Sequence, residues 1–405
     1  MSNNRRINSC LITGEPVTTI LDLGMHPYAD TFVGADQQHL SEPVLPLRVN
    51  LCDASGMIQL DCVSDDWDRY NLYSYSYTSS NGAYSRRHWQ ELAQDVREKT
   101  QLTGGRIVEI GSNDGYLLSQ FQPDFEVLGV DASDAMCALS RQRGVLVEHG
   151  IFGQDLAATL AIQGTADVIL ANNVVNHAND PLDFVRGVKQ LLSAGGWFVF
   201  EVPSWSWMMS QSRWDMIYHE HVSYFTVTSL FNLLARADLV IQQVEYVDFH
   251  GESLRIWAQH VGNSRAADGQ LLEILALERA QGLFDQSFYK KFAANMEHNR
   301  HRFLDRLLQL KLANPDRPII GVGAAAKANT WLNYHGVNHL LLDWVTDASP
   351  QKQGKYTPLS RIPIVGDEVF AQYSRPYALI LSWNISQQLR DNLLSINNRT
   401  EFINL

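Results

Sequence analysis

The sequence predicts an α/β protein in which helix-covered parallel sheets follow a small β-rich segment. Apolar runs of strand length recur from residue 106 onward, among them RIVEIG, ADVILAN and IPIVG, and each ends at glycine or a polar residue. Helical stretches such as HWQELAQDVREKT alternate with these runs, as is typical of βαβ units. At 405 residues the chain exceeds the usual size of a single core, so more than one such domain is expected.

The same pattern divides the chain into three segments. Residues 1–85 contain short strands and turns, such as PLRVNLC and GMIQLDC. Residues 86–243 form the first alternating series of helices and strands. Residues 244–405 contain a long helical stretch and then a second series that begins PIIGVGAAAKANT. We therefore expect a small N-terminal β-rich domain, a central Rossmann-like domain and a C-terminal Rossmann-like α/β domain.

Composition argues against several classes of protein. The formal net charge of -12 at pH 7 disfavours a nucleic-acid partner, because proteins that bind nucleic acid present basic surfaces. No apolar run reaches the roughly 18 residues of a membrane span, and no apolar segment of a signal peptide follows the N-terminus. We expect a cytoplasmic protein with no membrane segment. Four cysteines are too few for a disulfide framework in a chain of this size.

The stretch RIVEIGSNDGYLL predicts a ligand site after a strand. Gly111 and Gly115 permit a sharp turn and a close approach of the backbone to a ligand, and helix amides beyond them can meet a polar group. Asp131 ends the next strand, where an acid commonly binds ribose hydroxyls. The spacing is Glu-x-Gly-x-x-x-Gly, without the glycines of a pyrophosphate loop, and favours S-adenosylmethionine over NAD.

The cofactor contacts that this interpretation predicts follow two strands, RIVEIG and ADVILAN. They are Glu109, Gly111, Ser112, Asn113, Gly115, Asp131, Asn172 and Asn173. The alternative is a generic Rossmann-like domain with tight turns and no such ligand.

The stretch IYHEHVSYF crowds His219, Glu220 and His221 between two tyrosines. It has three readings: a metal site, an acid–base catalytic site, or a polar loop. Adjacent residues of a strand point to opposite faces, and no third ligand stands at a familiar spacing, so we expect no metal here. The residues alone leave the other two readings open.

Several motifs in the same order resemble one family, the sugar C-methyltransferases that act on nucleotide-linked 4-keto deoxysugars. They are LDLGMHPYADTF, VEIGSNDG, DMIYHEHVSYF, HGESLR and GVGAAAKANT, and they span nearly the whole chain. The resemblance implies a central class I methyltransferase domain that uses S-adenosylmethionine. It also implies a small-molecule nucleotide-sugar substrate and favours a monomer.

The resemblance further implies how the reaction proceeds. A base removes a proton from the carbon next to the sugar ketone, C3 beside a C4 ketone, and the resulting enolate attacks the methyl group in line. A base and a donor to the oxyanion are needed. By the resemblance His221 is the base and Glu220 its partner or an alternative base. Tyr218 and Tyr77 are expected near the keto oxygen, and His177 near the enolate oxygen.

In the family the C-terminal domain closes over the nucleotide-sugar. The resemblance therefore makes four residues candidate contacts to the phosphates or the sugar: Lys327, Lys352, Arg255 and His250.

The N-terminal segment departs from the family, whose zinc module has two Cys-x-x-Cys pairs. The stretch CLIT keeps Cys10 but has Thr13 in the second position, and CDAS keeps Cys52 but has Ser55. A neutral hydroxyl is a poor substitute for a thiolate. We expect no bound zinc.

Two other functions stay open at this stage. One is methylation of oxygen or nitrogen on a small molecule, which needs no base beside a ketone. The other is a non-catalytic binding protein that has kept the fold. The nucleotide, the sugar and the methylated carbon cannot be named from the sequence.

Overall fold

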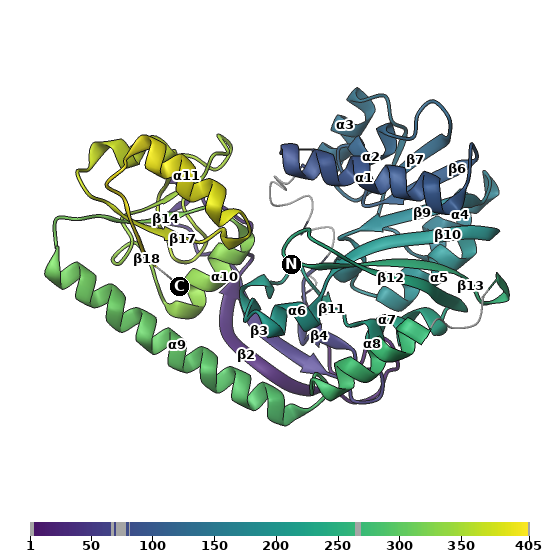
Figure 1. Cartoon of the computed structure of the whole chain (residues 1–405), viewed down its shortest axis with the longest axis horizontal. Helices are drawn as coiled ribbons and strands as arrows, with labels where there is room; N and C mark the ends of the chain where they lie inside the picture. Colours follow the sequence, from purple (N-terminus) through teal and green to yellow (C-terminus); the bar gives the residue numbers. More distant parts are fainter. Residues whose placement is uncertain (1–3, 66–68, 70–77, 81, 264–268, 404–405) are drawn as a thin grey trace. The chain divides into compact units, whose positions relative to one another are not determined.

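The computed structural model describes residues 4–65, 69, 78–80, 82–263 and 269–403 (Figure 1). The chain forms two compact units, and neither is a continuous segment. Unit 1 comprises Met1–Thr18, Asn50–Ser212 and His221–Phe284. Unit 2 comprises Thr19–Val49, Arg213–Glu220 and Asp285–Leu405.

Unit 1 is built on a seven-stranded sheet with the order β12-β13-β10-β9-β6-β7-β8. The strands are β6 (Arg106–Ile110), β7 (Glu126–Asp131), β8 (Val147–His149), β9 (Ala166–Asn172), β10 (Leu192–Pro203), β12 (Leu239–Val247) and β13 (Ser253–His260). β13 runs antiparallel to both β10 and β12, and the other neighbouring strands are parallel. The strand order reverses direction between β6 and β9, where open α/β sheets bind ligands beyond the carboxyl ends of the strands.

Helices cover both faces of this sheet (Figure 1). On one face α1 (Ala83–Thr100) and α2 (Tyr116–Ser119) bury side chains against alternate strand residues such as Ile107 and Val168. On the other, α4 (Gln154–Ile162), α5 (Pro181–Leu191) and α7 (Val227–Ala235) pack against Val108 and Ile169. The alternation follows the two-residue period of a strand. The remaining helices of unit 1 are α3 (Asp134–Gln142), α6 (Trp205–Ser210) and α8 (Gly269–Ala280).

The N-terminal part of unit 1 consists of short strands, as predicted. β1 (Arg5–Arg6) pairs antiparallel with β5 (Cys62–Val63), and β4 (Ile58–Leu60) pairs antiparallel with β11 (Ser223–Tyr224). Cys10, Ile12 and Met57 join the same hydrophobic cluster as α5 and α7. This part therefore shares its core with the large sheet.

Unit 2 contains a second sheet, of five parallel strands in the order β16-β15-β14-β17-β18. They are β14 (Ile319–Val322), β15 (Trp344–Thr346), β16 (Ile364–Val365), β17 (Tyr377–Ile380) and β18 (Glu401–Ile403). Unit 2 also holds α9 (Gln286–Ala313), α10 (Ala326–His335), α11 (Ser386–Ile396) and most of the neighbouring strands β2 (Thr18–Pro27) and β3 (Val44–Leu51). Two α/β sheets after a β-rich start confirm the predicted fold class.

The sequence-predicted boundary after residue 243 falls inside β12. Strand β13 lies between β10 and β12, and its partners include Phe198 to Pro203 of β10. The hairpin VEYVDFHGESLRIWAQH therefore completes the sheet of unit 1. The sequence shows two strands around a turn, but it does not show that the second one inserts beside a strand fifty residues earlier.

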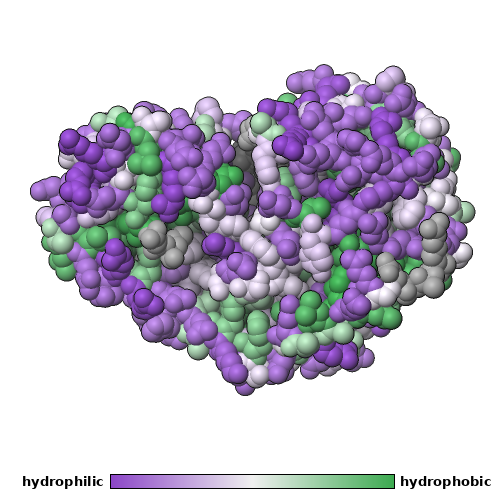
Figure 2. All heavy atoms as spheres, viewed as in Figure 1, coloured by the Kyte–Doolittle hydropathy of each residue, from purple (hydrophilic) through white to green (hydrophobic). Residues whose placement is uncertain are grey.

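The face drawn in Figure 2 is mostly hydrophilic, in keeping with the net charge of -12. Among the helices that the structure describes, none is long and apolar enough to cross a membrane.

Candidate active site

The loop after β6 turns on two glycines with positive φ, Gly111 (+70°) and Gly115 (+73°). A Cβ atom on Gly111 would lie 2.9 Å from Cγ2 of Val174, and one on Gly115 would lie 2.7 Å from Oγ of Ser140. Any side chain here would be strained and would collide with a neighbour. The loop is thus held close to the end of β6, and its backbone amides lie where the strand order reverses between β6 and β9.

Asp131, the last residue of β7, holds this loop in place. Its carboxylate accepts hydrogen bonds from the backbone N–H of Asn113 (2.8 Å) and of Ser133 (2.8 Å). Burial raises the pKa of Asp131, although these two bonds oppose the rise. A carboxylate fixed from behind in this way keeps lone pairs for a ligand hydroxyl.

Polar atoms at the end of β6 are buried without a partner among the described residues. Oε2 of Glu109 and Oγ of Ser112 are two of them. Burial, and then the charges of Asp114 and Asp131, hold the pKa of Glu109 well above its ordinary value. Such a set suits the ribose hydroxyls and the positive charge of S-adenosylmethionine, so the residues fit this cofactor.

A second group of buried polar atoms without a partner in the described residues lies at the end of β9 and just after it. Both amide atoms of Asn172 and of Asn176 are buried and have no hydrogen-bond partner in the described part of the chain. Asn173, between them, has a positive φ of 55° and donates its N–H to the carbonyl of Glu201. A buried polar group without a partner costs about 1–3 kcal/mol, which points to a ligand at these carboxamides. Sequence reasoning missed Asn176, because burial cannot be read from its position.

Two imidazoles lie together in unit 1. His177 ends the 3-10 helix η3 (Val175–His177), and its ring centroid lies 4.9 Å from that of His221, with the planes 77° apart. Burial, and then the charges of His221 and Arg69, hold the pKa of His177 well below its ordinary value. Its imidazole is therefore neutral at pH 7. His221 itself is only 6% exposed.

Arg69 fixes the turn that carries His177. Its guanidinium donates to the carbonyl of His177 (2.8 Å), to Oδ1 of Asn179 (2.8 Å) and to Oγ of Ser64 (3.1 Å). No motif of the sequence pointed to this arginine. It positions a predicted site residue from the N-terminal part of unit 1.

The predicted catalytic stretch passes from unit 2 to unit 1 between Glu220 and His221. In unit 2, Oε1 of Glu220 accepts a hydrogen bond from the N–H of Asp30 (3.3 Å), and Tyr218 is half-buried. His219, which the resemblance left without a role, is fully buried and its Nε2 lies 3.2 Å from the carbonyl oxygen of Pro46. Tyr77 lies outside the described residues.

Arg255 occupies a position that favours a structural role over the expected substrate contact. Its guanidinium is buried in unit 1 and pairs with Glu201 (2.7 Å) and Asp95. Burial alone would raise the pKa of Glu201, but His88 and Arg255 outweigh it and hold that pKa below its ordinary value. His250 also belongs to unit 1, where its ring packs on Phe249 at 4.2 Å.

Lys327 and Lys352 belong to unit 2. Nζ of Lys327 donates to Oδ1 of Asn384 (2.6 Å) and lies 4.6 Å from the ring centroid of Trp383. Burial lowers the pKa of Lys327 to about 8, against the opposing charge of Asp215. Nζ of Lys352 donates to the carbonyl of Ala324 (2.7 Å) in the turn after β14. The amine of Lys352 thus lies at the turn after β14, whereas that of Lys327, in the first turn of α10, lies at the residues after β17.

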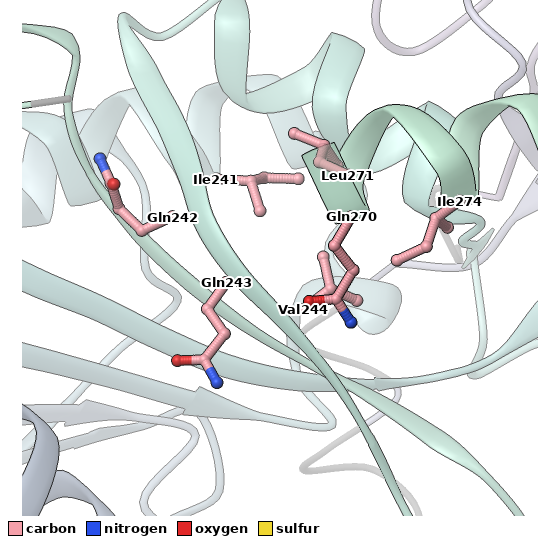
Figure 3. A pocket seen from close by; sticks show the side chains of 7 residues that line it. All are labelled: Ile241, Gln242, Gln243, Val244, Gln270, Leu271 and Ile274. Atoms are coloured by element: carbon pink, nitrogen blue, oxygen red, sulfur yellow. The ribbon is translucent and has the colours of Figure 1, made fainter. Parts of the chain in front are cut away.

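One hollow of unit 1 is lined by none of the site residues described above. It is formed by β12 and α8, with Ile241, Val244, Leu271 and Ile274 among its lining residues (Figure 3). Its volume is ≈ 10 Å³, enough for at most a single water. It is a packing defect and no substrate site.

Three family models match successive parts of the chain. One described as a putative zinc binding domain matches residues 10–69. A methyltransferase domain model matches residues 83–244, and a C-methyltransferase C-terminal domain model matches residues 248–404. No group of three or more His, Cys, Asp or Glu within the described ranges could hold a metal ion.

Individual proteins are also similar to the chain. C-methyltransferase NovU of Streptomyces niveus is 29% identical over 392 residues, 96% of this chain and 92% of that protein. A ubiquinone biosynthesis O-methyltransferase of a Ruegeria strain is 30% identical over 112 residues, 26% of this chain and 44% of that protein. The crystal structure of an S-adenosylmethionine-dependent methyltransferase from Clostridium acetobutylicum has 16% identity and a TM-score of 0.36, covering 45% of this chain and 93% of that one.

Proposed function

We propose, from the premise that this chain belongs to the family of S-adenosylmethionine-dependent C-methyltransferases, that its substrate is a nucleotide-linked keto-deoxysugar. The methylated carbon would be the one beside the ketone, C3 next to a C4 ketone. The family and the class of enzyme predicted from the sequence are confirmed. The substrate and the roles below are proposals.

The observation that carries the proposal is the imidazole pair of His177 and His221 in unit 1. Carbon methylation needs a base, because a C–H bond next to a ketone has to lose its proton before the carbon can act as a nucleophile. Methylation of an oxygen or nitrogen needs no carbon base. A buried imidazole beside a half-buried one that is held neutral suits the first reaction.

In this mechanism His221 accepts the proton from carbon. His177 is neutral at pH 7 because its pKa is lowered, so it acts as a neutral N–H donor to the enolate oxygen and not as a charged acid. Arg69 supports that role, since it fixes the turn of His177. Glu220 and Tyr218 remain candidates for an accessory base and a keto-oxygen donor by the family resemblance.

The cofactor would be held by the turn after β6 and by Asp131. Glu109 and Asn172 add polar atoms that lack a partner among the described residues. When bound, S-adenosylmethionine supplies the methyl group as a good electrophile. Asn176, whose carboxamide is equally orphaned, would contact the acceptor sugar through its donor and acceptor atoms.

By the family resemblance, Lys327 and Lys352 stay candidate contacts to the phosphates of the nucleotide. Both belong to unit 2, where Nζ of Lys352 donates to the carbonyl of Ala324 in the turn after β14 and Nζ of Lys327 donates to Oδ1 of Asn384. Hydrogen bonds to a phosphate would offset the free energy that a half-buried ammonium group loses when it is removed from water. His250 stays a candidate contact to the sugar.

The proposal is tested in D2O with a dTDP- or GDP-linked 4-keto-6-deoxysugar and S-adenosylhomocysteine in place of the methyl donor. We expect the protein to exchange the proton beside the ketone for deuterium. His221→Asn should slow both exchange and methylation at least about a hundredfold with unchanged affinity for S-adenosylhomocysteine. Methyl transfer to the sugar without any exchange activity would contradict the base and point to an oxygen acceptor.

A further inference from the structure

Two turns of the N-terminal part of unit 1 repeat one backbone pattern. Each begins with a cysteine, Cys10 or Cys52, and ends four residues later with a glycine of positive φ, Gly14 (+75°) or Gly56 (+66°). In each turn the glycine N–H donates to the cysteine carbonyl, at 2.8 and 2.9 Å. In each, the cysteine N–H donates to the carbonyl five residues on, at 2.8 and 2.9 Å.

The side chains of the two turns meet in crossed pairs. Sγ of Cys10 lies 3.1 Å from Oγ of Ser55, and Oγ1 of Thr13 lies 3.7 Å from Sγ of Cys52. For comparison, zinc bonds of about 2.3 Å to sulfur and 2.0 Å to oxygen give tetrahedral edges of roughly 3.5–3.8 Å. The Thr13–Cys52 distance falls within this range and the Cys10–Ser55 distance is a few tenths of an ångström shorter, so both pairs are spaced nearly as neighbouring ligands of a zinc ion.

The chemistry of these atoms does not match that geometry. Structural zinc is held by four thiolates or imidazoles, and here only two corners are thiols while the other two are neutral hydroxyls. The hydroxyls make hydrogen bonds with the thiols instead. This disagrees with the zinc-binding description of the family model that matches residues 10–69.

Packing and backbone bonds hold the turns without an ion. Cys10, Cys52 and Met57 belong to the large hydrophobic cluster of unit 1. The amide of Asn232, on α7, donates to the carbonyl of Ser55 at 2.9 Å. The backbone of the second turn is thus anchored to a helix of the main sheet.

We propose that in this chain a crossed pair of thiol–hydroxyl hydrogen bonds replaces the zinc ion of the module while its ligand geometry persists. The module is accordingly folded free of metal. Two substitutions, Thr13→Cys and Ser55→Cys, are then sufficient to restore a four-thiolate site.

The test compares the full-length protein with the double variant Thr13→Cys/Ser55→Cys. We expect the wild type to carry no zinc after purification and to show the same melting temperature with and without a chelator. The double variant should bind one zinc per chain, show tetrahedral cobalt(II) absorption bands when loaded with cobalt, and melt at a lower temperature when a chelator is added.

Three controls make each outcome decisive. Affinity for S-adenosylhomocysteine reports whether unit 1 of the double variant is folded. The single variants, with three thiols, should bind cobalt at least tenfold more weakly than the double variant. If the double variant does not fold, cobalt titration of the wild type tests the proposal instead. A stoichiometric tetrahedral cobalt spectrum that is lost in Cys10→Ser/Cys52→Ser would overturn it. A folded double variant that binds no zinc would also overturn it.

Discussion

The turn after β6 in unit 1 and the turn after β14 in unit 2 are held by the same device. Asp131 accepts one hydrogen bond from Asn113 in its turn and another from the N–H two residues after itself. Asp347 does the same, from Ala324 at 3.0 Å and from the N–H two residues on at 2.9 Å. In both units an acid at the carboxyl end of a parallel strand, Asp131 as the last residue of β7 and Asp347 as the residue after β15, fixes the neighbouring turn.

The charges placed around this shared device differ. In unit 1, the buried carboxyl group of Glu109 lies within the influence of the charges of Asp114 and Asp131. In unit 2, Nζ of Lys352 lies 3.7 Å from Oδ2 of Asp347, and Lys327 is the second residue of α10, the helix that follows the turn. One backbone plan is thus combined with further carboxyl groups in unit 1 and with an ammonium group in unit 2, in line with our proposal that the first binds S-adenosylmethionine and the second a phosphate.

The largest effect is expected from Asp131→Asn, with Asp347→Asn as its matched control. Losing a charge-assisted bond to a ribose hydroxyl costs about 1.5–3 kcal/mol, or roughly 10- to 150-fold in affinity. Isothermal titration with S-adenosylhomocysteine should show this loss for Asp131→Asn and none for Asp347→Asn. Equal losses would mean that the two turns do not differ in ligand as proposed.

A second prediction concerns the buried acid of unit 1. Because the pKa of Glu109 is raised in the folded chain, its contribution to stability is complete below about pH 4.3 and is lost as pH rises through the folded pKa. Glu109→Gln should therefore be more stable than the wild type at pH 8, because the unfolded wild type gains free energy by ionising this carboxyl group and the unfolded variant does not. Urea denaturation of the ligand-free protein between pH 5 and 8 should show the gap closing as pH falls. A pH-independent gap would contradict it.

A third prediction uses the amine of unit 2. The pKa of Lys327 is about 8, so its ammonium fraction falls above that pH. Affinity for dTDP should then weaken toward a limit of about tenfold per pH unit, and Lys327→Met should abolish this dependence. Lys311→Met, which removes an amine paired with Asp343, serves as the control. An unchanged pH profile in Lys327→Met would exclude this lysine as the phosphate contact.

The smallest effect compares two asparagines. Asn176 in unit 1 has both amide atoms buried without a partner in the described chain, whereas the Asn397 amide in unit 2 donates to the carbonyls of Phe370 and Tyr373. Asn176→Leu should raise the free energy of unfolding by about 1 kcal/mol, and Asn397→Leu should lower it by a similar amount. Thermal unfolding without ligands measures both. A destabilised Asn176→Leu would show that the carboxamide is satisfied within the protein.

Sequence reasoning identified the features that depend on local pattern. Gly111 and Asp131 were found because a turn glycine and a strand-end acid stand at fixed offsets from apolar runs. Partners that depend on tertiary folding were not found. Asp347 was passed over because the residues after it do not read as a ribose loop, although its hydrogen bonds repeat those of Asp131.

The same limit explains the interpretation of Arg255. The sequence places it in a polar turn motif, and only the insertion of β13 beside β10 brings it to Glu201. The burial of Asn176 could not be predicted either, because in the sequence it is one of several asparagines in a polar stretch. Long-range strand pairing and burial are properties of the whole fold, so no local motif carries them.

The chain passes between its two units five times, and this has a consequence for synthesis and for evolution. Unit 1 has all its residues only once Phe284 has emerged, and unit 2 only at the C-terminus. At usual rates of translation, roughly 6–24 s pass between the synthesis of the last residue of unit 1 and that of the last residue of unit 2. Residues 19–49 cannot complete their contacts within unit 2 before then. At the start of this interval residues 19–49 lack most of the residues of unit 2 with which they fold. For the same reason neither unit can be exchanged between proteins by a single genetic crossover.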